Sequence, residues 1–422
     1  MKIAVWHNLP SGGGKRSLYH HVRGLLEKGH TVESWCPPTA DQTYLPLNEL
    51  VTEHIVPFDW EPKSAKTSFG RLMSSYYNIT DKIKAMDAHC MQCAEEINNK
   101  DFDIIFVNPC TFFRVTSIAQ YIKIPKVNYI AEPYRWLYEA MPNPPWAALP
   151  LPEKTQWSPR YVKAFLHDLV KTQGLRVQVR EEWQNAKAFD MILVNSYFSR
   201  ESVLRAYGLE AKVCYLGIDT EQFHPLNIMR EKFIVGLGGI YSGKGIERAV
   251  YAIGTIEKSI RPDLIWIGNF SHEEYRKTVE GLALSLGVNL SFKVRISDEE
   301  IVAFLNRATA MIYTPLLEPF GFAPLEANAC GTPVVAIAEG GVRETIKDGI
   351  NGFLINGNEP LEMGKAISTL LKDEELAYRM GKQARNYVLE KWTWNSAIDR
   401  LEESFFNLTK EAKIKQSIFT CI

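Results

Sequence analysis

The chain has 422 residues, which is long for one domain and suits two domains that each bury a core. A formal net charge of −1 gives no global sign of nucleic-acid binding, and 46% hydrophobic residues are ordinary for a globular protein. Seven widely spread cysteines, an odd number, argue against a disulfide framework and favour a reducing, cytoplasmic compartment.

The first half of the chain predicts an α/β domain. A buried strand at 2–8 is followed by a turn with successive glycines, an amphipathic helix that extends to Lys28, and a second strand at 31–36. A strand, a glycine loop, a helix and a strand in this order open a doubly wound parallel sheet. Further short apolar runs predict strands at 103–108, 126–130 and 191–195. Prolines crowd the segment between Met141 and Pro159, which predicts an exposed loop or lid.

The second half of the chain predicts another α/β domain. Helical patterns alternate with apolar runs that predict strands at 233–238, 264–268, 290–294, 311–314 and 334–337. Ser297 and Glu300 form a capping box that starts a helix over 301–308, and Trp394 begins a long amphipathic helix that extends to about Lys413. Ligands of open α/β sheets bind at the carboxyl ends of the strands, so we expect binding residues in the loops that follow them.

The most informative segment is the loop and helix that precede the strand at 334–337. It contains two carboxylates eight positions apart, Glu318 and Glu326, in the sequence Glu-Pro-Phe-Gly-Phe-Ala-Pro-Leu-Glu. Pro324 opens a short helical pattern that stops at Gly331. The unpaired N–H groups of such a helix start suit a phosphate, whereas carboxylates repel phosphate and suit sugar or ribose hydroxyl groups. Alternatively, Glu326 only complements the helix dipole and Glu318 is solvated.

This segment resembles the E-x7-E signature of retaining nucleotide-sugar glycosyltransferases of the GT-B fold, the group 1 or GT4-type family. The resemblance implies two facing Rossmann-like domains, each with a doubly wound parallel sheet. Residues 1–213 would form the acceptor-binding domain and residues 214–393 the donor-binding domain. A C-terminal helix at about 394–422 would cross back and complete the first domain.

A second motif of this family follows the predicted strand at 233–238. The sequence from Gly238 to Gly245 approaches a P-loop, but Gly245 stands where a Ser or Thr should hold Mg²⁺, which argues against an NTPase. It is better matched to the family pattern G-R-L-x-x-x-K-G, in which Lys244 would bind the donor pyrophosphate. Gly239 stands where the family usually has Arg, so either another residue supplies the second cation or donor binding is weaker. Alternatively, Lys244 is a solvated lysine at a helix start.

A third resemblance lies in the first domain. The segment from Asn128 to Arg135 matches a family segment that often carries His at the position of Ala131, where it contacts the donor sugar. Glu132 and Arg135 are the nearest substitutes, unless they simply hold the loop. In similar enzymes the glycine loop after the first strand closes on the donor phosphates and the acceptor, although it is also compatible with an ordinary turn. The implied acceptor or cleft residues are Gly12, Gly13, Gly14, Glu132 and Arg135.

The implied donor-binding residues lie in the second domain. Glu318 would bind hydroxyl groups of the transferred sugar, Glu326 the ribose and Lys244 the leaving phosphate, which makes Glu318 and Lys244 the catalytic pair. Main-chain groups near Arg295 would contact the nucleobase, and the N–H groups at 340–341 would take phosphate. The full implied set is Gly238, Gly239, Lys244, Arg295, Glu318, Phe320, Gly321, Phe322, Leu325 and Glu326.

Other motifs are predicted to be structural. The D-x-D sequence at 101–103, which metal-dependent transferases use, stands before its strand and not at the carboxyl end of one. Cys90 and Cys93 lie on the apolar face of a helical pattern and predict core packing, because a zinc site normally needs a second ligand pair. We therefore expect no metal and no cofactor, with a nucleotide diphosphate sugar as co-substrate. Structural roles are also predicted for Asp219, Phe223 and Glu344.

The implied function is transfer of a hexosyl group from a nucleotide diphosphate sugar, UDP-linked first and GDP-linked next, with retention of configuration. The acceptor would be a glycan, a glycolipid or a small molecule, in surface polysaccharide or glycoconjugate synthesis. Two alternatives stay open: a catalytically degenerate binding or scaffold subunit, and a nucleotide-sugar epimerase of the same architecture. No feature predicts a nucleic-acid partner.

Basic and apolar residues near the predicted lid suggest a membrane surface. The helical pattern that starts at Ser158 carries apolar residues on one face and basic residues largely off it, and a second basic stretch contains Lys63, Lys66 and Arg71. These features predict weak peripheral association with the inner face of a membrane. A core-packed helix with a solvated basic face is the simpler alternative. No run approaches the roughly 18 apolar residues of a membrane span.

Overall fold

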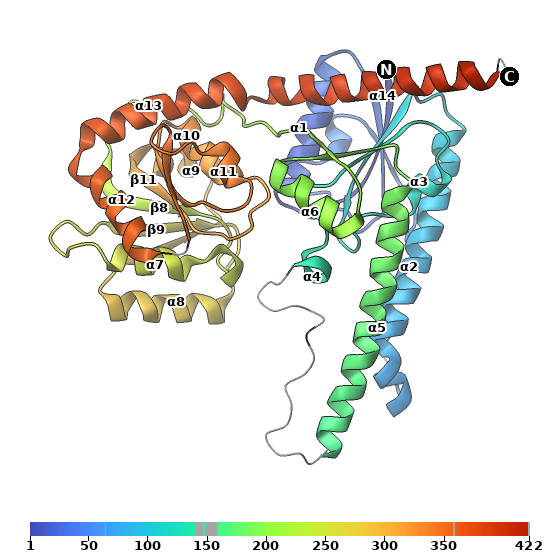
Figure 1. Cartoon of the computed structure of the whole chain (residues 1–422), viewed down its shortest axis with the longest axis horizontal. Coiled ribbons are helices and arrows are strands. Elements are labelled where there is room, and N and C mark those ends of the chain that lie inside the picture. Colours follow the sequence, from blue (N-terminus) through green and yellow to red (C-terminus); the bar gives the residue numbers. More distant parts are fainter. Residues whose placement is uncertain (64, 140–146, 148–157, 358, 421–422) are drawn as a thin grey trace. The chain divides into compact units, whose positions relative to one another are not determined.

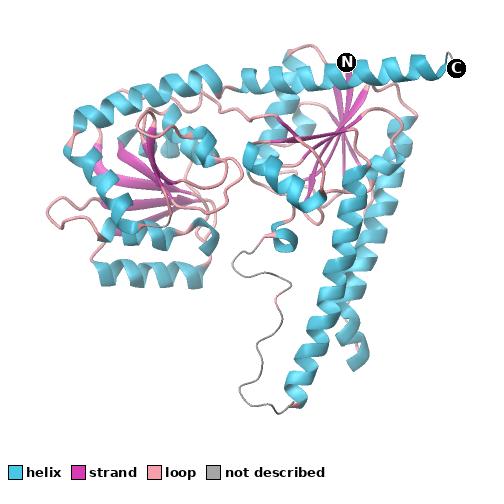
Figure 2. Cartoon of the chain, in the orientation of Figure 1, coloured by secondary structure: helices cyan, strands magenta, loops and turns pink. Residues whose placement is uncertain are grey.

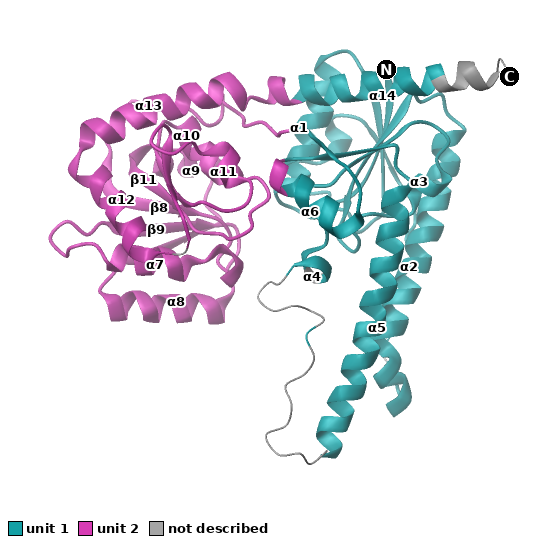
Figure 3. Cartoon of the chain, in the orientation of Figure 1, with its two compact units in different colours: residues 1–195, 199–214, 398–422 teal, residues 196–198, 215–397 magenta. Residues whose placement is uncertain are grey.

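The computed structural model describes the chain except residues 64, 140–146, 148–157, 358 and 421–422. The chain forms two compact units (Figure 3). Unit 1 comprises residues 1–195, 199–214 and 398–422, and unit 2 comprises residues 196–198 and 215–397. The predicted proline-rich lid falls largely on residues outside this description.

The described residues of unit 1 form a seven-stranded parallel sheet with the strand order β3-β2-β1-β4-β5-β6-β7 (Figures 1 and 2). Its strands are β1 (Lys2–Asn8), β2 (Thr31–Cys36), β3 (Thr52–Ile55), β4 (Ile104–Cys110), β5 (Lys126–Tyr129), β6 (Met191–Val194) and β7 (Lys212–Val213). The strand β4 is buried along its whole length. Strands of a parallel sheet are covered on both faces, which explains why they appear in the sequence as unbroken apolar runs.

Helices cover this sheet and extend beyond it. They are α1 (Gly13–Glu27), α2 (Ser68–Asn98), α3 (Ile118–Tyr121), α4 (Arg135–Tyr138), α5 (Pro159–Lys187) and α6 (Tyr197–Tyr207), with a 3-10 turn η1 (Leu47–Glu49). Ser158 caps α5 by accepting a hydrogen bond from the Tyr161 N–H, as the Ser-Pro sequence predicts. The long helices α2 and α5 lie side by side and extend past the strands (Figure 1). They approach closely at Gly174, where an added Cβ would lie 2.7 Å from Cδ1 of Ile79.

The described residues of unit 2 form a six-stranded parallel sheet with the order β10-β9-β8-β11-β12-β13. The strands are β8 (Glu231–Leu237), β9 (Asp263–Gly268), β10 (Leu290–Val294), β11 (Ala308–Tyr313), β12 (Val334–Ile337) and β13 (Gly352–Ile355). Successive strands are added on one side of β8 up to β10 and on its other side from β11 onward. The boundary between β8 and β11 is therefore the switch point where ligands bind in such sheets.

The helices of unit 2 alternate with its strands. They are α7 (Ile246–Gly254), α8 (Glu273–Leu286), α9 (Asp298–Arg307), α10 (Phe322–Ala329), α11 (Val342–Thr345), α12 (Pro360–Lys372) and α13 (Glu374–Lys391), with a 3-10 turn η2 (Ser242–Lys244). The predicted capping box of Ser297 and Glu300 is confirmed at the start of α9. A core of buried aliphatic residues and Trp266 lies between this sheet and its helices.

The C-terminal helix α14 (Trp394–Thr420) belongs to unit 1 from residue 398 onward. Ile398 packs on α1 at Gly24, where an added Cβ would lie only 2.4 Å from its side chain. Glu402 accepts hydrogen bonds from Lys28 and pairs with His30, at 3.0 and 2.8 Å. These contacts anchor the helix to the first domain of the sequence, as the resemblance implies.

Candidate active site

The loops that follow β8, β11 and β12 bring the predicted donor-binding residues together. These strands are neighbours in the unit 2 sheet, and their carboxyl ends share one edge. Gly238 follows β8, Lys244 ends the turn η2, and Glu318 lies in the loop after β11. The sheet topology therefore places residues 70 or more positions apart at the same switch point.

Lys244 and Glu318 form an ion pair at this edge. The Lys244 Nζ lies 2.9 Å from the Glu318 Oε2, and the two side chains are 21% and 22% exposed. Gly238 makes room for the lysine, since a Cβ there would lie 3.3 Å from the Lys244 Cδ and the backbone φ of 149° suits glycine. Lys244 and Glu318, both partly open to solvent, thus pair with each other at this edge. In place of this pairing, Lys244 could bind a phosphate and Glu318 a sugar hydroxyl group.

Tyr313 lies close to both glutamates of the signature, Glu318 and Glu326. It is the last residue of β11, it is buried, and its hydroxyl donates a hydrogen bond to Glu318. Burial and the nearby carboxylates of Glu318 and Glu326 raise the pKa of Tyr313 well above its ordinary value, so it stays a donor. Glu326 is itself buried on α10. In the sequence, the only signal for Tyr313 is its place at the end of a predicted strand.

The loop that carries Glu318 rests on the two glycines after β12. The Gly341 N–H donates to the Glu318 carbonyl oxygen at 2.8 Å. An added Cβ would lie 2.3 Å from that oxygen at Gly340 and 2.1 Å from the Pro319 carbonyl oxygen at Gly341. The expectation that the Gly341 N–H takes phosphate is therefore wrong, because this donor already holds the Glu318 loop.

The helix α10 begins two residues earlier than predicted. Its N-cap is Gly321, in the left-handed conformation with φ of 88°, and Pro324 is the third helical residue and not the first. Because proline has no N–H, the third position of this helix lacks a backbone donor. The Leu325 side chain is fully buried, and the contact of this residue with the donor stays a prediction. Phe320 is buried as well, against Phe322 and Trp392.

An aromatic ring occupies the space beside Gly239, the position where the family usually has Arg. An added Cβ at Gly239 would lie 2.5 Å from the Phe270 ring, and Phe270 stacks on Tyr241. A larger side chain would have to displace this aromatic pair. Arg248, on the first turn of α7, brings a different cation to the same edge, where its guanidinium lies 3.4 Å from the Thr314 carbonyl oxygen. The sequence analysis did not find Arg248.

Arg295 turns the chain at the end of β10. It has a positive φ of 56°, which is uncommon for a residue other than glycine. Its N–H donates to the Gly268 carbonyl oxygen at 3.0 Å and its Nε to the Asn269 carbonyl oxygen at 3.3 Å. These bonds hold Arg295 against the end of β9, and its contact with a nucleobase stays a prediction.

The predicted acceptor residues of unit 1 lie in two places. Gly12 caps α1 with a φ of 140°, and Gly13 and Gly14 are already in the first turn of the helix. Glu132 pairs with Arg135 and, at 3.5 Å, with Arg114. The two charged residues that were considered substitutes for the family histidine therefore neutralise each other.

The remaining structural predictions are confirmed by their contacts. Cys90 and Cys93 are buried in the unit 1 core, and Asp103 accepts a hydrogen bond from the Lys2 N–H at the start of its strand. The Glu344 carboxylate accepts from the N–H groups of Tyr197 and Phe198. Asp219 accepts from two backbone N–H groups, and Phe223 is buried.

One group of metal-type ligands occurs among the described residues. His7, Cys36 and Glu53 come from the neighbouring strands β1, β2 and β3, and their ligand atoms lie within 4.8 Å of one another. Glu53 pairs with His7 at 3.0 Å, and the ammonium of the buried Lys15 acts on both Glu53 and Cys36. Burial opposes ionisation of Glu53, yet His7 and Lys15 lower its pKa. Lys15 thus supplies here the positive charge that a metal ion would bring.

Residues 218–387 match the model of the family described as "Glycosyl transferases group 1". This segment contains Lys244, Glu318 and Glu326. A GDP-mannose-dependent alpha-(1-6)-phosphatidylinositol monomannoside mannosyltransferase of Mycolicibacterium smegmatis is 30% identical over 51% of this chain and 61% of its own length. A D-inositol 3-phosphate glycosyltransferase of Xylanimonas cellulosilytica is 26% identical over 58% of this chain and 62% of its length.

Residues 218–387 therefore belong to the group 1 glycosyltransferase family. The whole chain spans 61% and 62% of the length of these two curated relatives. The crystal structure of Anabaena HepE with UDP-glucose shares 19% identity with this chain, with a TM-score of 0.65 over 96% of the chain and 100% of HepE. A glycosyltransferase of Rickettsia africae has a TM-score of 0.66 at 17% identity, over 97% of the chain and 98% of its own. The GT-B fold predicted from the sequence is thereby confirmed.

Proposed function

We propose that this glycosyltransferase moves a hexosyl group from a nucleotide diphosphate sugar to an acceptor, with retention of configuration. The observation that supports this most directly is the contact between Lys244 and Glu318 at the switch point of the unit 2 sheet. Both residues lie inside the segment that matches the family model. A cation, a carboxylate and a helix start at one strand edge are the groups that a sugar diphosphate needs.

In the proposed donor complex, Lys244 exchanges its pairing with Glu318 for one with the leaving phosphate. The ammonium then stabilises the negative charge that develops as the glycosidic bond breaks. Arg248 is the second cation at this edge and takes the place of the family arginine. The acceptor hydroxyl oxygen bonds to the anomeric carbon on the face from which the phosphate leaves, and the leaving phosphate accepts the hydroxyl proton. Attack on that face retains the configuration without a covalent carboxylate nucleophile.

The released Glu318 carboxylate binds hydroxyl groups of the transferred sugar. Tyr313 holds this carboxylate from behind by a hydrogen bond, which limits its freedom when Lys244 moves to the phosphate. Glu326, from the helix that follows the loop, binds the ribose hydroxyl groups. Reaction thus depends on one carboxylate for the sugar and another for the nucleoside.

The donor is a UDP- or GDP-linked sugar in this proposal. The Mycolicibacterium relative is named as GDP-mannose-dependent, and Anabaena HepE was crystallised with UDP-glucose. Calorimetric titration of the protein with UDP-glucose, GDP-mannose and an ADP-sugar tests the choice. Binding of one donor together with slow release of its nucleotide supports the transferase. Binding with no nucleotide release indicates a scaffold subunit, and conversion of one sugar nucleotide into another indicates an epimerase.

We further propose that the free ends of α2 and α5 contact an anionic membrane that carries the acceptor. Leu166 and Leu169 are 42% and 50% exposed, so part of the predicted apolar stripe on α5 does not pack in a core. Phe69, near the start of α2, is 68% exposed. Exposed Lys66, Arg71 and Lys163 lie on the same helix ends or beside them. Lys63 contributes less than expected, since it pairs with Asp81 at 3.1 Å. None of the helices among the described residues is long and apolar enough to cross a bilayer.

A further inference from the structure

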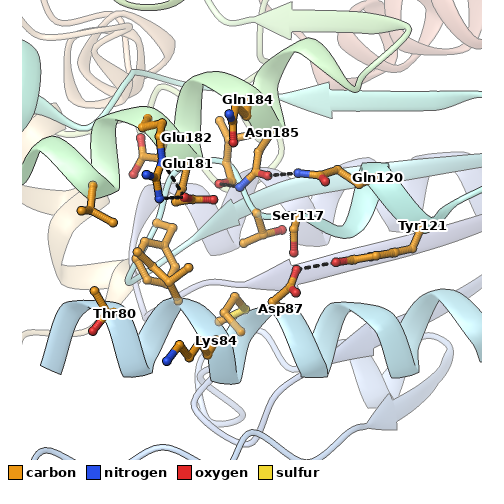
Figure 4. A pocket seen from close by; sticks show the side chains of 17 residues that line it. Thr80, Lys84, Asp87, Ser117, Gln120, Tyr121, Glu181, Glu182, Gln184 and Asn185 are labelled. Atoms are coloured by element: carbon orange, nitrogen blue, oxygen red, sulfur yellow. Dashed lines mark hydrogen bonds and ion pairs between the residues drawn. The ribbon is translucent and has the colours of Figure 1, made fainter. Parts of the chain in front are cut away.

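Two cavities adjoin the paired helices α2 and α5 of unit 1. The first, of about 380 Å³, is lined largely by polar side chains that already bond to one another (Figure 4). Tyr121 donates to Asp87 at 2.7 Å, and Gln120 donates to Asn185 at 2.6 Å. These four groups satisfy each other, whereas the buried hydroxyl groups of Thr116 and Ser117 in the same lining have no hydrogen-bond partner among the described residues. Acidic residues of this lining, among them Asp87 and Glu181, disfavour an anion in this cavity.

The second cavity, of about 360 Å³, has a different lining. It takes Ile79 and Lys82 from α2, whereas the first cavity takes Thr80 and Lys84 from that helix. Phe112, Phe113 and Tyr134 form aromatic walls, and Lys171 adds a second ammonium group. None of the described residues that line it is acidic.

Lys82 is held inside the aromatic part of this cavity. Its Nζ lies 4.2 Å from the ring centroid of Trp60 and 4.7 Å from that of Phe112. No carboxylate of the described residues lies within ion-pairing distance of it. Burial lowers the pKa of Lys82, which is the response of a half-buried ammonium group that lacks a counter-ion. An anion in the cavity would supply that counter-ion.

The second cavity lies at the carboxyl end of the unit 1 sheet. Thr111 and Phe112 directly follow β4, and the Thr111 N–H donates to the carbonyl oxygen of Asn8 at 2.7 Å. Asn8 ends β1, the strand that leads into the glycine loop. The cavity is therefore adjacent to the strand end where the sequence places acceptor contacts.

We propose that this cavity binds the acceptor through an anionic group, with an apolar or ring portion of the same molecule against Phe112 and Tyr134. The proposal rests on the proposed glycosyl transfer and specifies the chemical class of its acceptor. Lys82 and Lys171 pair with the anion, a phosphate or a carboxylate. The aromatic walls bury the attached apolar surface, which favours binding in proportion to the area removed from water. An alkyl phosphate and a sugar phosphate share this chemistry.

Calorimetric titration of the full chain with small probes tests the site. The anionic probes are hexyl phosphate and glucose 1-phosphate, and the neutral ones are hexanol and glucose. We expect at least one anionic probe to bind about tenfold or more tightly than its neutral counterpart. Tighter binding of hexyl phosphate indicates a lipid-like acceptor, and tighter binding of glucose 1-phosphate indicates a sugar phosphate. Equal affinity for anionic and neutral probes, or binding of inorganic phosphate as tight as that of both anionic probes, would overturn the proposal.

Charge-removing variants locate the binding. Lys82→Gln and Lys171→Gln should each weaken binding of the preferred probe about tenfold. Lys84→Gln is the matched control, because Lys84 lies two residues from Lys82 and lines the other cavity. Lys171 is exposed on α5, so its replacement should leave the melting temperature unchanged even if Lys82→Gln does not. Equal losses in all three variants would reject the site.

The same titrations separate this proposal from the proposed function. UDP and GDP are titrated into each variant, and their affinities should not change. If the unaltered protein binds the probes but neither UDP nor GDP, the result would count against glycosyl transfer and not against the anion site. Absence of probe binding with intact nucleotide binding would count against the anion site alone.

Discussion

Lys244, Glu318 and Tyr313 form a continuous set of contacts at the carboxyl end of β11. The ammonium bonds to the carboxylate from one side and the tyrosine hydroxyl from another. Neither contact involves Glu326, which is buried one turn into α10. The two glutamates of the signature therefore have different surroundings, and we expect their replacement to have different effects.

Glu318→Ala should lower turnover by about 100-fold or more, the order of magnitude for loss of one transition-state contact. Glu326→Ala should mainly weaken nucleotide binding, which raises KM for the donor. Steady-state kinetics of the purified variants measure both effects. Glu375→Ala, an exposed glutamate on α13, is the control and should match the unaltered enzyme. Unchanged kinetics in both signature variants would remove these residues from the donor site.

Glu182 predicts a specific pH dependence of stability. It is buried on α5, and desolvation raises its pKa to about 7, although Gln178 and Tyr207 donate hydrogen bonds to it. Between the unfolded pKa and about 7 the folded state binds more protons than the unfolded state, so stability falls as pH rises through this window. Glu182→Gln should remove this loss. Relative to the unaltered protein, the free energy of unfolding should rise by at most roughly 3 kcal/mol at pH 8, and this difference should disappear near pH 4.

Urea unfolding of Glu182→Gln and of the unaltered protein at the two pH values measures this difference. The neighbouring Glu181→Gln serves as the control, because Glu181 is partly exposed and pairs with Arg180. A Glu182→Gln effect of the same size at both pH values would contradict the assignment.

Both cavities adjoin the paired helices α2 and α5, and the ends of these helices form the proposed membrane contact of unit 1. Their close approach depends on Gly174, which faces Ile79 and the backbone of Tyr76. Because this approach brings Lys82 and Lys171 to one cavity, the packing of the helices is a condition for the proposed acceptor site.

Gly174→Leu should lower the free energy of unfolding of unit 1 by about 1–3 kcal/mol, because the added side chain overpacks the contact with Ile79. Urea unfolding monitored by circular dichroism measures the change. Gly281→Ala is the opposite control, since no atom lies within 4 Å of an added Cβ on α8. It should stabilise by about 0.5–1 kcal/mol through its helix propensity. Equal effects of the two substitutions would show that α2 and α5 do not pack as described.

The ends of these helices predict salt-sensitive membrane binding. Replacement of Lys66, Arg71 and Lys163 by Ser should reduce sedimentation with anionic liposomes at low salt, because each basic residue near such a surface contributes about 1 kcal/mol. Lys277, Lys372 and Lys382, all exposed on unit 2 helices, are the control positions for the same charge change. Binding to anionic liposomes no stronger than to neutral ones would reject the membrane proposal.

At the scale of the whole chain, the family match and the fold cover different extents. The family model covers residues 218–387, which lie in unit 2, whereas the likeness to HepE extends over 96% of the chain at 19% identity. The proposed donor chemistry is therefore supported by a recognisable sequence, and the proposed acceptor side by the fold and local geometry. Whether the reaction needs a metal ion is tested on the full chain.

Activity should survive EDTA, because the Lys244 ammonium and the α10 N-terminus perform the charge stabilisation in the proposed mechanism. An assay of donor turnover with and without chelator measures this. Loss of activity that Mn²⁺ restores would contradict the mechanism. His7, Cys36 and Glu53 would then be the first residues to replace.

The sequence by itself determined those strands of both sheets that have strong apolar runs. It also singled out Lys244, Glu318 and Glu326 as candidate site residues. These were accessible because buried parallel strands and a glycine loop before a helix leave local patterns. The edge strands β3, β7 and β13 were missed, since they are short and pair on one side only. Domain limits predicted at 213 and 214 lie next to the observed change of unit after residue 214.

Only the tertiary structure decided which groups meet. Tyr313 reaches Glu318, Phe270 fills the space beside Gly239, and Glu132 pairs with Arg135, because strand order and side-chain packing bring them together. The second cavity brings together Lys82 of α2 and Lys171 of α5, which are far apart in the chain. No local pattern records such contacts, since their energy depends on distances that the folded backbone alone defines.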